Sequence, residues 1–155
     1  MKKMKKILTC IIVSAICSSC QQRPIEVVFV KAPVDSLITN WSDSWNDHDS
    51  AGVRNLFMAD ALLLDNNLIA NNTDEIAVKW IHPNINLVHH FKSTKLQDWS
   101  ANDRAGYTGK YEFDVIVNDS VLAHPKGAYT VNWIKTGNGD WKITTAAIHS
   151  LNEEN

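Results

Sequence analysis

The sequence AHPKGAYTVNWIKTGNGDWKITTAAIHS, which spans Ala123–Ser150, predicts two long β-strands folded onto each other. Apolar residues alternate with polar or small ones in both halves, and this is the period of a sheet with one buried face. Gly137, Asn138 and Gly139 tolerate the positive φ values of a tight reversal. We therefore expect a hairpin that turns at Thr136–Asp140 and against which the rest of the chain packs. The side chains expected on one face are Tyr129, Val131, Trp133, Trp141, Ile143, Thr145 and Ala147.

Upstream of the hairpin, apolar residues recur at helical intervals and predict a helix that begins at Val34. Its apolar stripe contains Leu37, Ile38, Trp41 and Trp45. A short second helix is expected next, capped by Asp49 or Ser50, because either side chain can accept a hydrogen bond from the first turn. The apolar residues of this second helix are Val53, Leu56 and Phe57.

The segment Ala61–Asp65 has the length and apolarity of a buried strand, and Asn66–Asn67 is expected to turn it. A third helix is expected from Asn72, with Glu75 completing a capping box. Because proline disfavours helix in the residue before it, this helix is expected to end before His82–Pro83.

Two more strands are expected before the hairpin. Leu87–Trp99 alternates imperfectly, with a slip between Phe91 and Leu96 that predicts a bulge. Tyr107–Val117 alternates regularly and predicts a half-buried strand. Asn118–Ser120 is expected to lead into the final hairpin.

The N-terminus has the three parts of an export signal. Four lysines within residues 2–6 precede the apolar run Ile7–Ile16, which is too short for a membrane-spanning helix, and small residues lead up to Cys20. This arrangement resembles a bacterial lipoprotein signal, in which cleavage leaves an acylated Cys20 at the N-terminus. A plain secretory signal and an uncleaved anchor are the alternatives. The first reading places the protein in the cell envelope, anchored to a membrane through lipid.

Cysteine usage and charge exclude several functions. The three cysteines, Cys10, Cys17 and Cys20, all lie in the predicted signal or at its end, so the domain has no disulfide, thiol nucleophile or cysteine metal site. Removal of residues 1–19 takes four lysines from fifteen basic residues, which leaves eleven against seventeen acidic ones and a net charge of −6. An acidic domain without a basic stripe is not typical of nucleic-acid binding.

The predicted order of helices followed by long antiparallel strands is that of an α+β cone. The residues also resemble the nuclear transport factor 2-like superfamily, and within it the SnoaL-like proteins. The resemblance covers roughly residues 34–149. Together with the N-terminal signal, this resemblance predicts four parts of the chain. They are a signal (1–19), a lipid anchor and tether (20–33), a SnoaL-like domain (34–150) and a tail (151–155). The segments that carry the resemblance are Trp41–Asp49, Leu56–Ala61, Ala105–Tyr111, Tyr129–Trp133 and Trp141–Ile143.

This resemblance implies a mostly apolar pocket between the helices and the concave face of the sheet. The candidates for its wall are Trp41, Trp45, Tyr111, Phe113 and Trp133. Plain core packing is the alternative interpretation of each of these aromatic residues. Six tryptophans in 155 residues predict an aromatic interior but do not by themselves predict a ligand.

Asp65 is the best candidate for chemistry. The segment Phe57–Asp65 is similar to the one that, in ketosteroid isomerases of this superfamily, ends with the aspartate acting as general base. Burial beside an apolar pocket raises the pKa of a carboxyl group and brings a base closer to working pH. Tyr111 or His149, the latter at the pocket rim, are the candidate acids. The alternatives are an Asp65 that accepts hydrogen bonds in the Asn66–Asn67 turn and a His149 that is an exposed strand-end residue.

Other chemistries lack the residues that they need. Adjacent residues in a strand point to opposite faces, so His89 and His90 are not expected to chelate one metal ion. No serine lies in the context of a hydrolase nucleophile, and the glycines are too scattered for a phosphate-binding loop. We therefore expect neither a metal nor another cofactor.

Two functions remain. The first is a non-catalytic envelope lipoprotein that binds a small apolar or aromatic ligand in its cone. The second is a proton-transfer enzyme of the isomerase or dehydratase type that uses Asp65. They differ because an enzyme requires at least two polar groups that converge in the pocket, whereas a binding protein needs only orienting ones. From the resemblance we also expect a homodimer formed through the outer face of the sheet.

Overall fold

The computed structural model of the protein describes residues 30–151. The predicted signal, the predicted acylation site Cys20 and most of the predicted tether lie outside the described residues, as do residues 152–155. Among the described helices, none has the length and apolarity needed to cross a membrane.

Helical segments come first in the described chain, and long strands dominate its second half. The helical segments are α1 (Val34–Asn46), α2 (Ser50–Asn55), α3 (Thr73–Ile76), the π-helix η1 (Ala77–Ile81) and α4 (His82–Asn84). The strands are β1 (Phe57–Asp65), β2 (Leu68–Ala70), β3 (Val88–Ser100), β4 (Arg104–Val117), β5 (Ser120–Ala123), β6 (Lys126–Lys135) and β7 (Trp141–Ser150).

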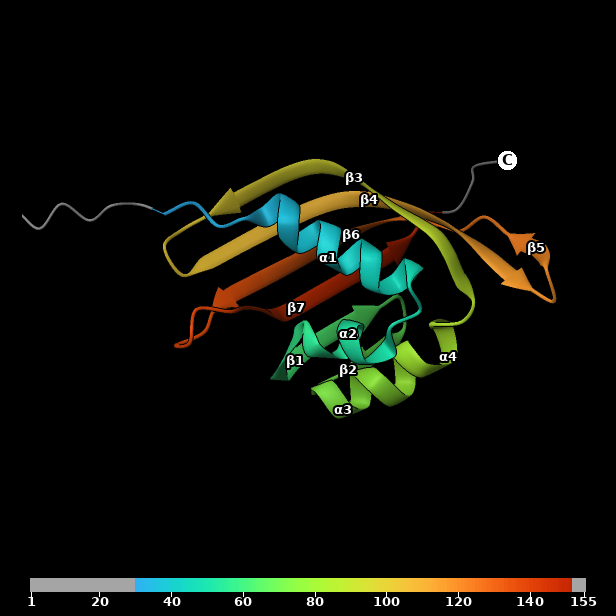
Figure 1. The fold of residues 1–155 in the computed structure, drawn as a ribbon, viewed down its shortest axis with the longest axis horizontal. Helices are drawn as coiled ribbons and strands as arrows, with labels where there is room; N and C mark the ends of the chain where they lie inside the picture. Colours follow the sequence, from blue (N-terminus) through green and yellow to red (C-terminus); the bar gives the residue numbers. More distant parts are fainter. Residues whose placement is uncertain (1–29, 152–155) are drawn as a thin grey trace, which may run out of the picture.

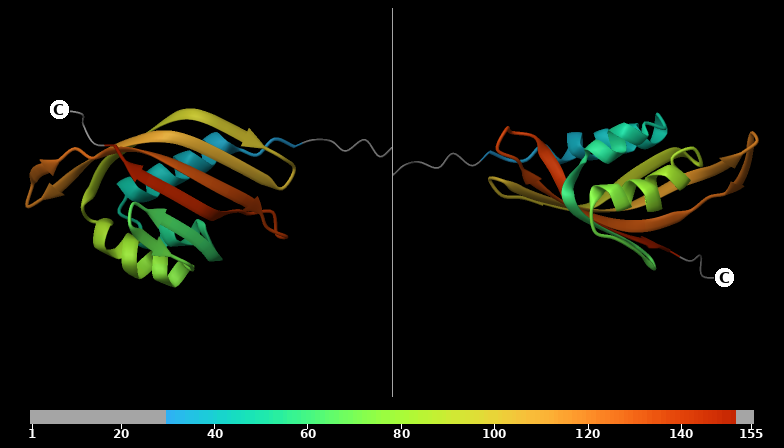
Figure 2. Two further views of the ribbon diagram at one scale, coloured as in Figure 1. Left: turned by 180° about the vertical axis from the view of Figure 1, so that it is seen from behind. Right: turned by 90° about the horizontal axis from the view of Figure 1, so that it is seen from below.

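Within residues 30–151, seven strands form one sheet in the order β2-β1-β7-β6-β4-β3, with β5 paired to β4. β1 runs parallel to β7, and the other pairs are antiparallel. The sheet curves, and the helices cover its concave face (Figures 1 and 2). The architecture is therefore the predicted α+β fold with a curved, mostly antiparallel sheet.

The predicted hairpin is confirmed as β6 and β7, with Val131 opposite Ala146 and Tyr129 opposite Ile148. The expectation that Thr145 and Ala147 share this buried face is wrong, because a register shift at Asn132–Trp133 places Ala146 and Ile148 there instead. Of the residues that turn the chain between these strands, Gly139 alone has a positive φ, 95°. A residue with a side chain is strained at that φ, so Gly139 is the position where the turn requires glycine.

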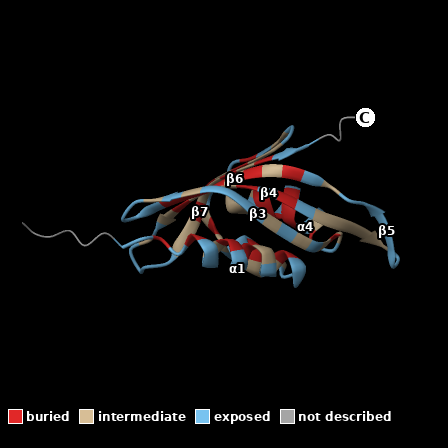
Figure 3. Cartoon of the chain, turned by 90° about the horizontal axis from the view of Figure 1, so that it is seen from above, coloured by how far each residue is buried: buried red, intermediate tan, exposed pale blue. Residues whose placement is uncertain are grey.

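Helix α1 is confirmed, and its apolar stripe packs onto the sheet. Val34, Ile38, Trp41 and Trp45 are buried in the core. Figure 3 shows the same division along α1, with buried residues on the side of the sheet and exposed ones on the other side. Burial of this stripe is the main stabilising contribution of α1, since an isolated helix of this length is marginal in water.

Helix α2 is shorter than the sequence predicts. Of the two candidate caps, Asp49 is the N-cap, and its side chain accepts a hydrogen bond of 2.8 Å from the backbone N–H of Gly52. The prediction that Leu56 and Phe57 belong to this helix is wrong, because the helix ends at Asn55 and Phe57 begins β1. Strand β1 accordingly starts four residues before the predicted Ala61.

The third helix does not end before His82–Pro83, so that prediction is also wrong. After α3 the chain widens into the π-helix η1, in which the His82 N–H donates to the Ala77 carbonyl, and then continues through Pro83 to Asn84. In this wider turn an N–H donates to the carbonyl five residues earlier instead of four, and this changes the hydrogen-bond partners of the carbonyl groups just before Pro83. Asn84 Nδ2 donates to the Trp80 carbonyl at 2.8 Å, which gives that group a partner within the interrupted helix.

Strand β3 contains two irregularities, one between His89 and Lys92 and one between Lys95 and Gln97. The predicted single slip between Phe91 and Leu96 is therefore two bulges. Downstream, the short strand β5, which the sequence does not predict, lies between the turn at Asn118 and Asp119 and the hairpin. Asn118 and Asp119 have positive φ values of 49° and 60° and turn the chain tightly into β5, which forms an arm with the end of β4 (Figure 1).

Candidate functional site: an aromatic cavity

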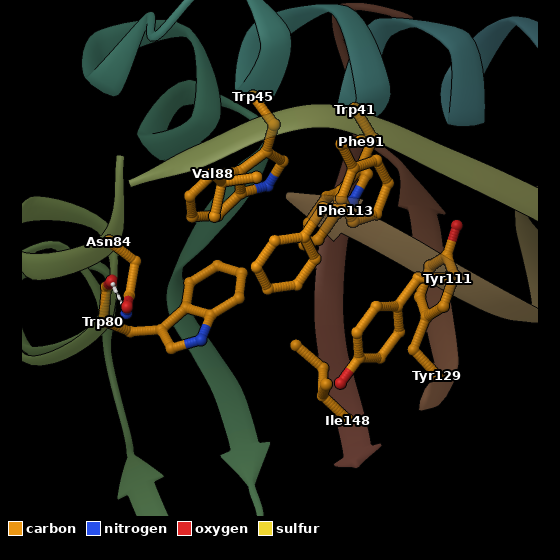
Figure 4. Close-up of a pocket in the computed structure, with 10 residues that line it drawn as sticks. All are labelled: Trp41, Trp45, Trp80, Asn84, Val88, Phe91, Tyr111, Phe113, Tyr129 and Ile148. Carbon is orange, nitrogen blue, oxygen red and sulfur yellow. Dashed lines mark hydrogen bonds between the residues drawn. The ribbon is translucent and has the colours of Figure 1, made fainter. Parts of the chain in front are cut away.

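A cavity of about 80 Å³ lies between α1, the helical segment 77–84 and the concave face of the sheet. Seven aromatic rings, two aliphatic side chains and one amide line it (Figure 4). The lining residues are Trp41, Trp45, Trp80, Asn84, Val88, Phe91, Tyr111, Phe113, Tyr129 and Ile148.

Simple periodicities place several of these rings. Trp41 and Trp45 are four residues apart on α1 and therefore share a face of the helix. Tyr111 and Phe113 are two residues apart on β4 and point to the same side of the sheet. The confirmed periodicities thus bring four of the predicted wall residues, Trp41, Trp45, Tyr111 and Phe113, to one cavity.

The rings pack against one another as well as against the cavity. Trp41 stacks on Tyr129 with 6.3 Å between ring centroids and 16° between planes. Trp45 contacts Trp80 edge to face at 4.9 Å and 79°. Such pairs add to the stability that burial itself supplies, and they restrict how far each ring can turn.

The lining is nearly free of polar groups. Among the described residues that line the cavity, none is charged, and the amide of Asn84 already donates to the Trp80 carbonyl. Burial raises the pKa of Tyr111, the nearby Asp65 charge raises it further, and a hydrogen bond with Ser150 opposes the shift. The Tyr111 phenol therefore stays protonated at neutral pH.

Tyr129 presents its ring to the cavity and directs its hydroxyl group elsewhere. Ser93 Oγ lies 2.6 Å from the hydroxyl of Tyr129 and 2.6 Å from that of Tyr107. Burial raises the pKa of Tyr129, and its hydrogen bond with Ser93 opposes that shift only in part. Tyr129 is thus a neutral, hydrogen-bonded wall residue.

Two buried donors in the wall have no partner. Among the described residues that are not exposed, the buried side-chain nitrogen and oxygen atoms that lack a hydrogen bond are Trp41 Nε1 and Trp45 Nε1. Trp41 is only 2% exposed and Trp45 only 3%. Figure 4 shows both nitrogens on the side of the rings turned away from α1, toward the other lining side chains.

Asp65 lies beside the cavity and does not line it. Its Oδ2 accepts a hydrogen bond of 2.8 Å from Trp80 Nε1, and its Oδ1 accepts one of 3.0 Å from Asn66 Nδ2. Asn66 Nδ2 also lies 3.1 Å from Ser150 Oγ, which connects this turn to β7. Both carboxylate oxygens of Asp65 thus have partners, and one of the two partners, Asn66, belongs to the Asn66–Asn67 turn.

Trp133 and His149 do not take the positions that the sequence predicts. Trp133 is buried in the core but does not line the cavity, because it lies farther along β6 than Tyr129, opposite Ala105 and Ile143. His149 follows the lining residue Ile148 and therefore points to the other face of the sheet, where it is exposed. The placement of His149 at the pocket rim is wrong.

Other lining residues were missed by the sequence analysis. Trp80 comes from the π-helix and Phe91 from the bulged part of β3, and neither position follows from a regular period. The position of Tyr129 could have been predicted in part, because the strand period places it on the same buried face of the hairpin as Val131. Its ring could have been placed near the cone, although not specifically against Trp41.

The histidines on β3 have separate surroundings. The His89 ring contacts that of His48 at 4.5 Å, whereas His90 Nδ1 lies 2.8 Å from Asp114 Oδ2. His124 Nδ1 lies 2.7 Å from the other Asp114 oxygen, and these two hydrogen bonds lower the pKa of the Asp114 carboxyl group. Within residues 30–151, no group of three histidine or carboxylate residues has the arrangement of a metal site.

The curved sheet with helices on its concave face is the cystatin-like fold of the nuclear transport factor 2-like (NTF2-like) proteins, and solved structures of that description match this chain. No family model matches the sequence, and no curated protein does.

Three solved structures illustrate the similarity, each below 25% identity. A ketosteroid isomerase-like protein from Erwinia carotovora atroseptica has a TM-score of 0.66 and 14% identity, over 77% of this chain and 95% of its own. An NTF2-like superfamily protein from Salmonella enterica has a TM-score of 0.66 and 13% identity, over 79% and 91%. An NTF2-like protein with a cystatin-like fold from Novosphingobium aromaticivorans has a TM-score of 0.61 and 13% identity, over 78% and 81%.

Proposed function

We propose that this protein is a non-catalytic envelope lipoprotein whose SnoaL-like domain binds a small apolar or aromatic molecule in its cone. The observation that carries the proposal is the cavity wall of seven aromatic rings and two aliphatic side chains, with no charged side chain among the described lining residues. Such a wall favours apolar ligands because their transfer from water is favourable and leaves no charge unpaired. A cavity of about 80 Å³ limits such a ligand to a small molecule.

The binding test uses toluene as probe and the chain from residue 20 onward, without the signal. Toluene should raise the melting temperature in a concentration-dependent way, since a ligand that binds only the folded state stabilises it. Ile148→Phe should abolish this effect by filling the cavity, whereas Ile134→Phe, a half-buried position of β6 that does not line the cavity, should preserve it. A melting temperature that no toluene concentration changes would refute the proposal.

The envelope address is tested separately, at Cys20. The basic residues, the apolar run and the small residues before Cys20 support acylation at that residue. Labelling with a palmitate analogue in a bacterial host should be lost in Cys20→Ala and retained in Cys17→Ala. The opposite pattern would move the acylation site to Cys17, and no labelling of the unsubstituted chain would exclude a lipid anchor. One or more acyl chains would hold the domain at the membrane.

A second function, proton transfer with Asp65 as base, has one specific observation in its favour. Asp65 accepts a hydrogen bond from Trp80, which itself lines the cavity, and its charge acts on the Tyr111 phenol. A carboxylate and a neutral phenol thus lie at the same end of the cavity. The enzyme would additionally require Asp65 to turn toward a substrate and release Trp80 or Asn66. The ligand-binding proposal needs no such rearrangement, and for this reason we prefer it.

A further inference from the structure

We propose that the ligand is a neutral molecule with a hydrogen-bond acceptor, such as a carbonyl or ether oxygen, which the indole N–H groups of Trp41 and Trp45 bind. This inference rests on the proposed binding function and adds the chemical class of the ligand. It starts from the two buried indole nitrogens that have no partner among the described residues.

An unpartnered buried donor is expensive in free energy. Leaving such a group without a hydrogen bond costs about 1–3 kcal/mol, and native proteins contain few of them. Here two occur together, one turn apart on α1, in side chains that line the same cavity. Contacts with neighbouring ring faces, such as that between Trp45 and Trp80, compensate a missing hydrogen bond only weakly.

The position of the donors indicates where an acceptor would lie. Both nitrogens are on the side of the rings that faces the other lining residues (Figure 4). Each exposes less than 1 Å² of surface, so neither bulk water nor the open part of the cavity reaches them, and binding of an acceptor requires the indole rings to move from their packed positions. Apart from the Asn84 amide and the Tyr111 hydroxyl, the remaining wall is apolar, so most of the rest of the ligand is apolar as well.

The charge of the surroundings selects a neutral acceptor over a carboxylate. No lysine, arginine or histidine is among the described residues that line the cavity. At its edge lies the Asp65 carboxylate, which accepts a hydrogen bond from Trp80. A buried anion without a cation carries a large desolvation penalty, and a neighbouring carboxylate adds repulsion.

The test compares cyclohexanone with methylenecyclohexane, two rings of the same shape that differ in C=O against C=CH₂. Both are titrated into the ¹⁵N-labelled chain from residue 20 onward. The indole N–H resonances of Trp41 and Trp45, assigned with Trp41→Phe and Trp45→Phe, should move downfield with the ketone and not with the alkene. The ketone should bind about tenfold more tightly, which corresponds to about 1.4 kcal/mol for hydrogen bonds to the two donors.

The variants and the alkene separate this inference from the function on which it rests. Trp41→Phe and Trp45→Phe should each reduce the preference for the ketone, whereas Trp133→Phe, a buried tryptophan that does not line the cavity, should retain it. Equal binding of ketone and alkene, without indole shifts, would overturn the inference and still support an apolar binding cavity. Binding of neither probe would overturn both.

Discussion

Asp65 lies half-buried at the end of β1, and both of its carboxylate oxygens accept hydrogen bonds. An asparagine at this position offers one acceptor oxygen, so either Trp80 or Asn66 loses its partner. We therefore expect Asp65→Asn to lower the free energy of unfolding by about 1–3 kcal/mol in urea titrations.

The same variant separates the two proposed functions. Asp65→Asn should not change the affinity of the folded protein for toluene, because Asp65 does not line the cavity. Any weaker apparent binding should be explained by the smaller fraction of folded protein. Asp60→Asn, at an exposed position of the same strand, serves as control. If a substrate for proton transfer is found, a drop in kcat of about a hundredfold or more in Asp65→Asn would instead identify Asp65 as a general base.

For individual residues, the sequence predicts the direction of a side chain wherever the residue follows a regular helical or strand period. Trp41 and Trp45 share a helix face, and Tyr111 and Phe113 share a strand face, so their common orientation could be read directly. Trp133 satisfies the same strand period but lies too far along β6, because a period gives the face and not the position along the cavity. The pairing of Asp65 with Trp80 depends on a π-helix that no period predicts.

Helix α2 has only six residues, and its stability depends on its cap and its packing. The Asp49 carboxylate satisfies the Gly52 N–H, which would otherwise have no partner within the first turn. Asp49→Ala should lower the free energy of unfolding by about 1 kcal/mol in urea titrations. Asp47→Ala, an exposed carboxylate two residues earlier that does not cap the helix, should change it by less than half as much. Equal effects would show that the loss is general to this acidic turn.

Elements with strong local signals could be predicted, and elements that depend on distant partners could not. Helix α1, the long strand β4 and the β6–β7 hairpin all show sustained periods and match the structure. The short strands β2 and β5 were missed because three or four residues carry too little pattern. The continuation of the third helix through Pro83 was missed because the chain widens into a π-turn just before the proline, and no sequence period predicts such a turn.

The whole molecule presents an outer sheet face that we propose as a homodimer interface. Trp99 is 48% exposed and lies over Gly106 on that face, where a side chain on Gly106 would clash with the ring. The half-buried Leu62 and Leu64 are on the outer face of β1. Two copies packed through this face would cover these apolar side chains.

A chain that begins at Ala32, which is itself buried in the core, should sediment as a dimer at micromolar concentration. Trp99→Lys should convert it to a monomer. Val121→Lys, at a similarly exposed apolar residue on the β5 arm, should leave the dimer intact. A monomer for the unsubstituted chain would remove the proposed interface without affecting the cavity.

The parallel pairing of β1 with β7 has a consequence for the order in which the protein can be made. β1 is held in the sheet by the short β2 and by β7, whose residues 141–150 are synthesised long after those of β1. Asp65, which lies opposite Ile148, therefore gains this sheet neighbour only once β7 has been synthesised. Such long-range pairing slows folding. A stop codon before Trp141 would leave β1 without its parallel partner.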